Sequence, residues 1–203
     1  ALTGKPLRAP FEFPQPAGFA ELTRDGRTLV VVAGRMLHAR DVADGRPRFA
    51  PVALANSPQH VELNPDGNSV AVGWLDHDAQ GMGEFLETHG LREGARAAGP
   101  LRIPGILDGL IFSPDGTRLL AWNFSSATLR DGHTLAPIPG PLARMQLSPR
   151  DSIEDGSRIM AAAFDANDGV WLSVAEFMKN GKDVAGLRHH DRTGALRVMS
   201  TPG

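Results

Sequence analysis

The densest group of potentially reactive side chains lies in the segment WLDHDAQGMGEFLETH, which begins at Trp74. Asp76, His77, Asp78 and Glu84 carry carboxylates and an imidazole, the groups that bind divalent cations or act as an acid and base pair when they converge. In a continuous strand, however, Asp76 and Asp78 share one face and His77 points to the other. We therefore interpret the segment as a solvated hairpin loop, and we keep these four residues as candidate ligand-binding residues.

His60 is a second candidate ligand-binding residue. It precedes the short run VEL, at the point where the chain would enter an inner strand and could line the mouth of a channel. His189 and His190 are adjacent, and neighbouring strand residues point to opposite faces, so they cannot both bind one metal ion without distortion. We interpret this pair as surface histidines.

The segment FDANDGVWLSVAEFMKNGKD holds three large apolar residues with little charge between them. Trp171, Phe177 and Met178 could form an exposed interface, because soluble domains seldom expose such patches without a purpose. The interpretation we favour is that VWLSVAEFM is an internal strand and contributes to the core. Both interpretations stay open from the residues alone.

The chain contains no linear motif of a known catalytic chemistry. It has no cysteine, no nucleophile elbow, no phosphate-binding glycine loop and no helical His-Glu pair at metalloprotease spacing. We therefore assign no catalytic residue, no metal and no cofactor, and we expect a noncatalytic protein. The alternative is a metal-assisted lactonase-like or hydrolase-like enzyme that uses Asp76, Asp78 or Glu84 with Ca²⁺ or Mg²⁺.

Composition narrows the classes of partner. The 203 residues include 21 Lys and Arg against 23 Asp and Glu, for a formal charge of -2. No basic field is therefore available for nucleic acid or for an anionic membrane surface. No apolar run approaches the length of a membrane helix, and the opening ALTGKPLRAP lacks the order of a signal peptide. We expect a soluble chain, without nucleic acid or membrane insertion, in either a cytoplasmic or an extracytoplasmic compartment.

Three segments repeat one pattern: AELTRDGRTLVVV, VELNPDGNSVAVGW and LIFSPDGTRLLAW. Each has an apolar run, an Asp-Gly turn and a second apolar run, which indicates two strands joined by a tight hairpin. The Asp-Gly pairs stand at 25–26, 66–67 and 115–116, and we place a fourth at 155–156. The intervals of 41, 49 and 40 residues are typical of four-stranded propeller blades.

A second repeated element, a short strand, a glycine turn and an outer strand, closes each unit. Examples are ARDVADGRPRFAP, TLRDGHTLAPIPG and HHDRTGALRVM. We therefore expect one all-β domain over 1–203, a propeller of about four blades of four antiparallel strands near 15–54, 55–103, 104–142 and 143–203. The proline-rich APIPGPL is expected to connect the third blade to the fourth.

The N-terminal residues 1–14 are expected to form the outer strand of the last blade or of another blade. In one interpretation Lys5–Phe13 joins the fourth blade and closes a small ring, which removes exposed sheet edges. In the other, the chain is part of a larger propeller, or two arcs pair through their open edges as a homodimer.

The segments FSPDGTRLLAW and LNPDGNSVAVGW and the closing turns resemble bacterial WD-repeat-like propellers of the Ser-Pro-Asp-Gly kind. The resemblance covers nearly the whole chain and implies a β-propeller scaffold. It also implies a binding or sensor module that recognises a protein or small ligand, as part of a larger bacterial signalling or envelope protein. A purely structural module that assembles through open blade edges is a further alternative.

Overall fold

The computed structural model describes residues 9–103, 105–140, 142, 144–146, 158–167, 169–177, 183–193 and 195–200. Within these residues the chain is all β and has no helix, and therefore no helix that could cross a membrane. The strands form four sheets of four, and within each sheet every strand pairs in antiparallel order with the next one along the chain. This confirms the expected all-β architecture of about four blades.

The first sheet holds β1 (Ala17–Leu22), β2 (Thr28–Ala33), β3 (Met36–Asp41) and β4 (Val52–Ala53). The second holds β5 (His60–Leu63), β6 (Ser69–Asp78), β7 (Gly81–Gly90) and β8 (Arg96–Ile103). The third holds β9 (Leu107–Phe112), β10 (Arg118–Asn123), β11 (Ser126–Asp131) and β12 (Arg144–Gln146). The fourth holds β13 (Arg158–Phe164), β14 (Val170–Phe177), β15 (Asp183–His190) and β16 (Leu196–Ser200).

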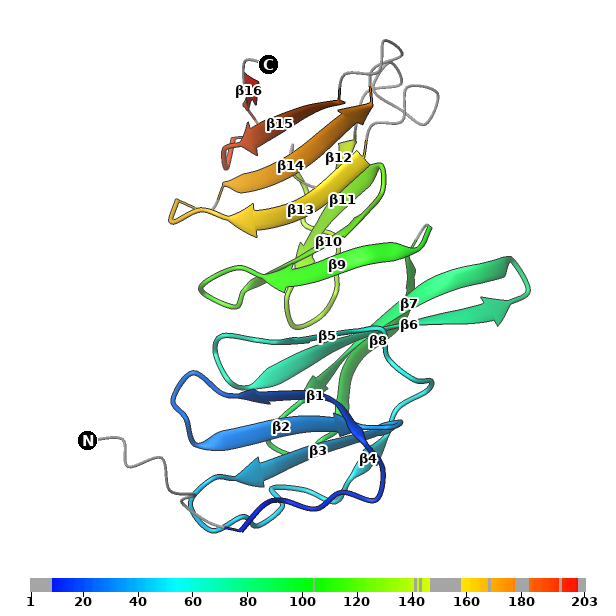
Figure 1. Ribbon diagram of the computed structural model, residues 1–203, viewed down its shortest axis with the longest axis vertical. Coiled ribbons are helices and arrows are strands. Elements are labelled where there is room, and N and C mark those ends of the chain that lie inside the picture. Colours follow the sequence, from blue (N-terminus) through cyan, green and yellow to red (C-terminus); the bar gives the residue numbers. More distant parts are fainter. Residues whose placement is uncertain are drawn as a thin grey trace.

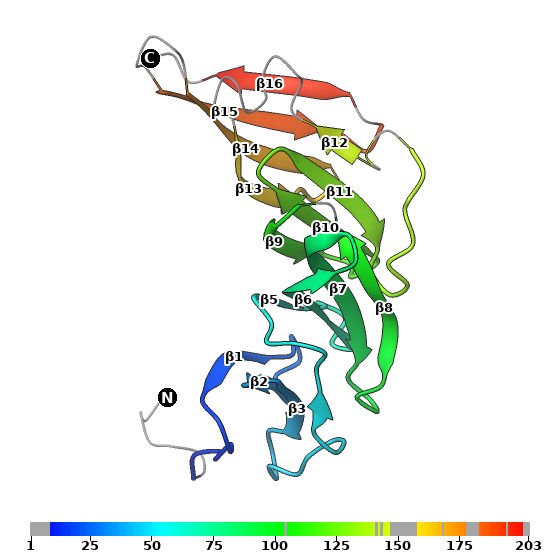
Figure 2. The same cartoon turned by 90° about the vertical axis from the view of Figure 1, so that its right-hand side faces the viewer.

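The four sheets stack face to face in an open arc, with the first and fourth sheets at its two ends (Figures 1 and 2). The first strands of the sheets, β1, β5, β9 and β13, lie along the same side of the arc (Figure 2). Adjacent first strands contact each other from β5 to β9 and from β9 to β13. This radial arrangement is that of propeller blades.

Each junction between neighbouring sheets has its own apolar core. Residues such as Val30 and Leu37 of the first sheet pack against Val72 and Trp74 of the second. The second and third sheets meet at a core that includes Leu86 and Leu119. The third and fourth meet at a core that includes Leu129 and Leu172. Inner sheets are therefore apolar on both faces, which explains their continuous apolar runs.

The Asp-Gly turns form the expected hairpins between the first two strands of three sheets. Gly26, Gly67 and Gly116 have φ of 69°, 72° and 74°, which residues with a Cβ rarely adopt. The fourth expected turn was misplaced: the loop between β13 and β14 runs from Asp165 to Gly169. Asp155-Gly156 precedes β13 and lies outside the described residues.

The third sheet extends beyond the expected boundary at 142, because its outer strand β12 begins at Arg144. The segment APIPGPL therefore lies inside this sheet, between β11 and β12, and does not connect it to the fourth. Prolines lack the N–H that a paired strand needs. Among the described residues of this segment, pairing is limited to an isolated bridge between Pro137 and Arg130. Prolines near residues 47–51 shorten β4 in the same way.

The N-terminal segment does not form the expected strand in the part that the structure describes, residues 9–14. Phe11 and Phe13 lie against the first sheet, with the Arg40 guanidinium 5.8 Å and 5.4 Å from their ring centroids. Phe13 also makes an edge contact with His38 at 5.0 Å. The interpretation that Lys5–Phe13 joins the fourth sheet is thus wrong for residues 9–13. Aromatic packing holds the segment on the first sheet, and β16 already forms the outer edge of the fourth.

Candidate functional site

The acidic segment lies on a long hairpin, because β6 and β7 have ten residues each and project beyond the other strands (Figure 1). Asp76 and His77 are exposed, and the Asp76 carboxylate accepts a hydrogen bond from the His77 backbone N–H. Asp78 caps the turn by accepting from the N–H of Gln80, and it forms an ion pair with Arg102 at 3.1 Å. These side chains stabilise the hairpin.

Strand register separates the predicted carboxylates. Asp76 is opposite Gly83 and Leu75 is opposite Glu84, so the side chain of Glu84 lies on the other face of the sheet from Asp76 and Asp78. Among the described residues no three His, Asp or Glu side chains form a group that could hold a metal ion. The hairpin therefore does not bring together the ligands that the metal-assisted alternative requires.

The structure does bring together two of the predicted residues, His60 and Glu84. His60 Nε2 lies 3.9 Å from Glu84 Oε1 and 3.0 Å from the carbonyl oxygen of Leu107 in the third sheet. Glu84 Oε2 accepts a hydrogen bond from the N–H of Leu107 at 3.4 Å. The pair thus joins the second and third sheets beside their apolar core.

Gly73 lies directly beside this pair. It is opposite His60 on β5, and a Cβ there would lie 3.4 Å from both Glu84 Oε1 and His60 Cβ. Glu84 is fully buried, and its Oε1 has no hydrogen-bond partner. Burial raises the pKa of Glu84, and His60 and the Leu107 N–H only partly oppose that effect. The carboxylate is therefore a costly buried group that does not face solvent.

A second buried polar cluster lies on the opposite face of β7, and its pairing was not predicted from the sequence. Glu87 and His89 are 1% and 3% exposed, and His89 Nε2 lies 2.9 Å from Glu87 Oε1. His89 Nδ1 is 3.1 Å from the carbonyl of Gly94, and Arg96 contacts Glu87 Oε2 at 3.4 Å. Alternation along β7 could have shown that Glu87 and His89 share a face. Their burial depends on the first sheet, so it could not be read from the pattern.

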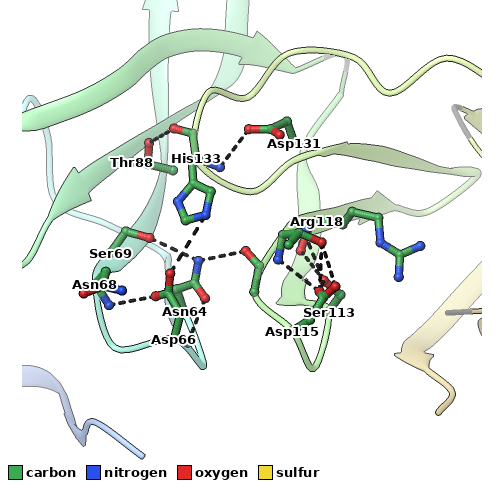
Figure 3. Close-up of polar contacts among 12 residues, drawn as sticks. Asn64, Asp66, Asn68, Ser69, Thr88, Ser113, Asp115, Arg118, Asp131 and His133 are labelled. Atoms are coloured by element: carbon green, nitrogen blue, oxygen red, sulfur yellow. Dashed lines mark hydrogen bonds and ion pairs between the residues drawn. The ribbon is translucent and has the colours of Figure 1, made fainter. Parts of the chain in front are cut away.

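Polar side chains also join the second and third sheets at their Asp-Gly turns (Figure 3). Asn64 is 1% exposed and donates from Nδ2 to the Gly116 carbonyl at 2.9 Å. The ring of His133 points toward Asp66, with Nε2 3.9 Å from Oδ2 (Figure 3). Thr88 Oγ1 donates to the His133 carbonyl at 3.1 Å. These contacts hold one sheet in register with the next.

The fourth sheet has one face that no described residue covers. Its inner face packs on the third sheet through residues such as Leu172 and Val174. On the other face, register aligns Ser173 with Leu187 and Leu187 with Met199. Leu187 and Met199, which are 45% and 49% exposed, therefore lie side by side on this uncovered face. Leu196 and Val198 are also exposed, but register aligns them through His190 and Arg188 with Val170 and Leu172 of the inner face.

Trp171, a predicted interface residue, lies on this uncovered face. It stacks on His189 with ring centroids 4.3 Å apart, and His189 Nε2 is 2.6 Å from Asp165 Oδ2. The His189 hydrogen bond is the largest cause of the lowered pKa of Asp165. His189 is thus a partly exposed residue of this face that is paired with Asp165. β14 is an internal strand ending at Phe177, and Met178 lies outside the described residues.

Sequence comparisons find no matching protein family and no matching curated protein. Structure comparison finds similar folds in solved proteins. A eukaryotic initiation factor aligns with a TM-score of 0.65 at 12% identity, over 94% of this chain and 45% of that one. The protein U3-55K aligns with a TM-score of 0.54 at 9% identity, over 94% of this chain and 62% of that one. The chain has a propeller-like all-β fold. It spans less than two thirds of the length of either structure.

Proposed function

We propose that this chain is a noncatalytic protein-binding module of the bacterial WD-repeat-like kind, and that its partner packs on the uncovered face of the fourth sheet. One observation carries the proposal: the apolar side chains centred on Leu187 and Met199 have no cover among the described residues. Contiguous exposed apolar surface of this kind marks interaction sites in soluble proteins.

The face has the chemistry of a junction between blades. In the other three junctions an apolar sheet face meets the apolar face of the next sheet. The fourth sheet offers a similar surface, with Trp171, Leu187 and Met199 on it. The partner that fits is therefore another antiparallel β-sheet with an apolar face, supplied by a further blade of a larger propeller.

The buried charged groups support a noncatalytic role. Glu84 is sealed between two sheets, and Glu87 is paired with His89 and Arg96 inside the second sheet's junction with the first. Neither carboxylate faces solvent, where a substrate would reach it. The polar residues at the Asp-Gly turns are occupied in joining sheets.

The proposal is tested by substitutions on the uncovered face of the fourth sheet. Without its partner, the chain should associate through this surface, so light scattering should show a molar mass that rises with concentration, and the hydrophobic dye ANS should bind. Leu187→Glu and Met199→Glu should each abolish both effects. Met82→Glu, at an exposed apolar residue on the β6–β7 hairpin, is the matched control and should leave both unchanged. A monomer that binds no dye at high concentration would overturn the proposal.

A further inference from the structure

A cleft of about 190 Å³ lies between the second and third sheets. Ile103 at the end of β8 and Leu107 at the start of β9 form one side, and the third sheet forms the rest. Register aligns Thr128 with Ala121 on one side and with Arg144 on the other, so these residues share the face that looks toward the second sheet. The other described residues that line the cleft are Asn123, Ser126, Leu129, Arg130 and Pro137.

The described residues that line the cleft include positively charged side chains but no carboxylate. Arg130 and Arg144 are its only charged residues, and Glu84, which contacts the Leu107 N–H, is fully buried and does not line the cleft. A guanidinium at such a place favours an anion, and its planar fork matches a carboxylate.

Arg130 is held in place but lacks a charged partner among the described residues. Its Nη1 donates to the Leu135 carbonyl at 3.0 Å, which fixes the side chain along β11. Its Nε is buried without a hydrogen-bond partner. Burial lowers the pKa of Arg130, the direction expected for a desolvated guanidinium without a counter-ion. An anion bound in the cleft would supply the missing counter-charge.

The neutral residues of the cleft select the kind of anion. Ile103, Leu107 and Pro137 provide apolar walls beside the two arginines. Such walls gain from contact with carbon atoms and give nothing to inorganic phosphate, whose surface is entirely polar. Ser126 and Thr128 add hydroxyl groups at the same face.

We propose that this cleft binds a carboxylate on a short apolar stem, with Arg130 and Arg144 at the carboxylate and the apolar walls on the stem. The carboxylate can come from a glutamate side chain of a partner protein or from a free short dicarboxylic acid. The cleft shares no residue with the uncovered face of the fourth sheet, so the site stands or falls independently of the function proposed above.

The test is a titration of the ¹⁵N-labelled chain followed by NMR. The ligands are a capped pentapeptide with one central glutamate, the same peptide with glutamine, glutarate and inorganic phosphate. We expect the glutamate peptide or glutarate to shift amide signals around the cleft, and the glutamine peptide and phosphate to leave them unchanged. Tighter binding of the peptide than of glutarate identifies a protein side chain as the source, and the reverse order identifies a free acid.

Variants connect the binding to the two arginines. Arg130→Gln and Arg144→Gln should each weaken binding about tenfold, the loss expected for one charge-assisted pair. Arg92→Gln, at an exposed arginine on the β7–β8 turn, is the matched control and should bind as the unmodified chain does. Arg144 is exposed, so Arg144→Gln tests the site even if Arg130→Gln unfolds. Absence of binding, equal binding of the glutamine peptide or phosphate, or full affinity in Arg144→Gln would overturn the proposal.

Discussion

Asn64 of the second sheet donates a hydrogen bond of 2.9 Å to the backbone carbonyl of Gly116 in the third. The corresponding residues of the other two Asp-Gly turns, Thr23 and Ser113, instead bond to the aspartate of their own turn. Asn64 differs because its longer side chain spans the gap between sheets, and a Cβ on Gly116 would overlap its Oδ1. The side chain at this position of the repeat thus bonds within its own turn in the first and third sheets, and in the second sheet it joins two sheets.

Asn64→Ala should therefore lower the free energy of unfolding by about 2 kcal/mol, because it leaves the Gly116 carbonyl without its partner. Asn64→Ser should cost less, since a serine can cap its own turn as Ser113 does. Urea unfolding measures both. Asn68→Ala, at an exposed residue of the same turn, should change stability by less than about 0.5 kcal/mol. An unchanged stability in the serine variant, which keeps a turn cap but loses the Gly116 contact, would show that the bond between sheets contributes nothing.

The buried carboxylate of Glu87 should be stabilising because it is paired. Glu87→Gln removes the charged partner of both His89 and Arg96 and leaves His89 between two neutral groups, the new amide and the Gly94 carbonyl. Breaking a buried ion pair on one side costs about 3 kcal/mol or more, which thermal unfolding would detect as a large fall in Tm. Glu93→Gln, at an exposed residue of the adjacent turn, is the control. An unchanged Tm for Glu87→Gln would contradict the assignment of a structural ion pair.

Removing the charge of Glu84 should stabilise the protein, in contrast to the loss expected for Glu87. Its Oε1 has no hydrogen-bond partner and burial raises its pKa, so its ionised form opposes folding above the unfolded pKa. Glu84→Gln keeps the shape and an acceptor for the Leu107 N–H but removes the charge, so it should raise Tm at pH 8. The gain should shrink as the pH is lowered, because the raised pKa makes the native carboxyl take up a proton before the unfolded one does. A lower Tm at pH 8 would show that the pairing with His60 outweighs burial.

The titration of Glu62 should make the stability of the protein depend on pH over a defined range. Burial, with the nearby carboxylate of Glu21, raises its pKa to about 7 from 4.5 in spite of a hydrogen bond from the Phe112 N–H. The folded state therefore binds more protons than the unfolded state between these values, and stability falls as pH rises through them. Glu62 is partly exposed, so solvent screening reduces the size of the effect.

The difference between Glu62→Gln and the unmodified chain isolates this effect. Burial lowers the pKa of His38 and of His190, which makes stability rise with pH and masks the Glu62 contribution in either protein alone. The variant's advantage in free energy of unfolding should grow from pH 5 to pH 8, as measured by urea unfolding at each pH. Parallel curves would contradict the raised pKa.

The sequence by itself determined the repeat. Alternating apolar runs around Asp-Gly pairs predict hairpins from local chemistry, since Gly26, Gly67 and Gly116 supply the positive φ that a tight turn needs. Three of the four turns and the number of strands in each sheet followed from this pattern. It failed at the fourth turn and at β12, where an insertion and a run of prolines break the spacing, and at the N-terminal segment, where aromatic packing replaces strand pairing.

Only the tertiary structure decided which polar residues meet. Asp76 and Glu84 stand close in sequence but point to opposite faces of one sheet, while His60 reaches Glu84 across Gly73. Asn64 and Gly116 come together although 52 residues separate them. These relationships depend on how one blade stacks on the next. Stacking is set by the apolar cores between sheets, and no local pattern in a single strand records it.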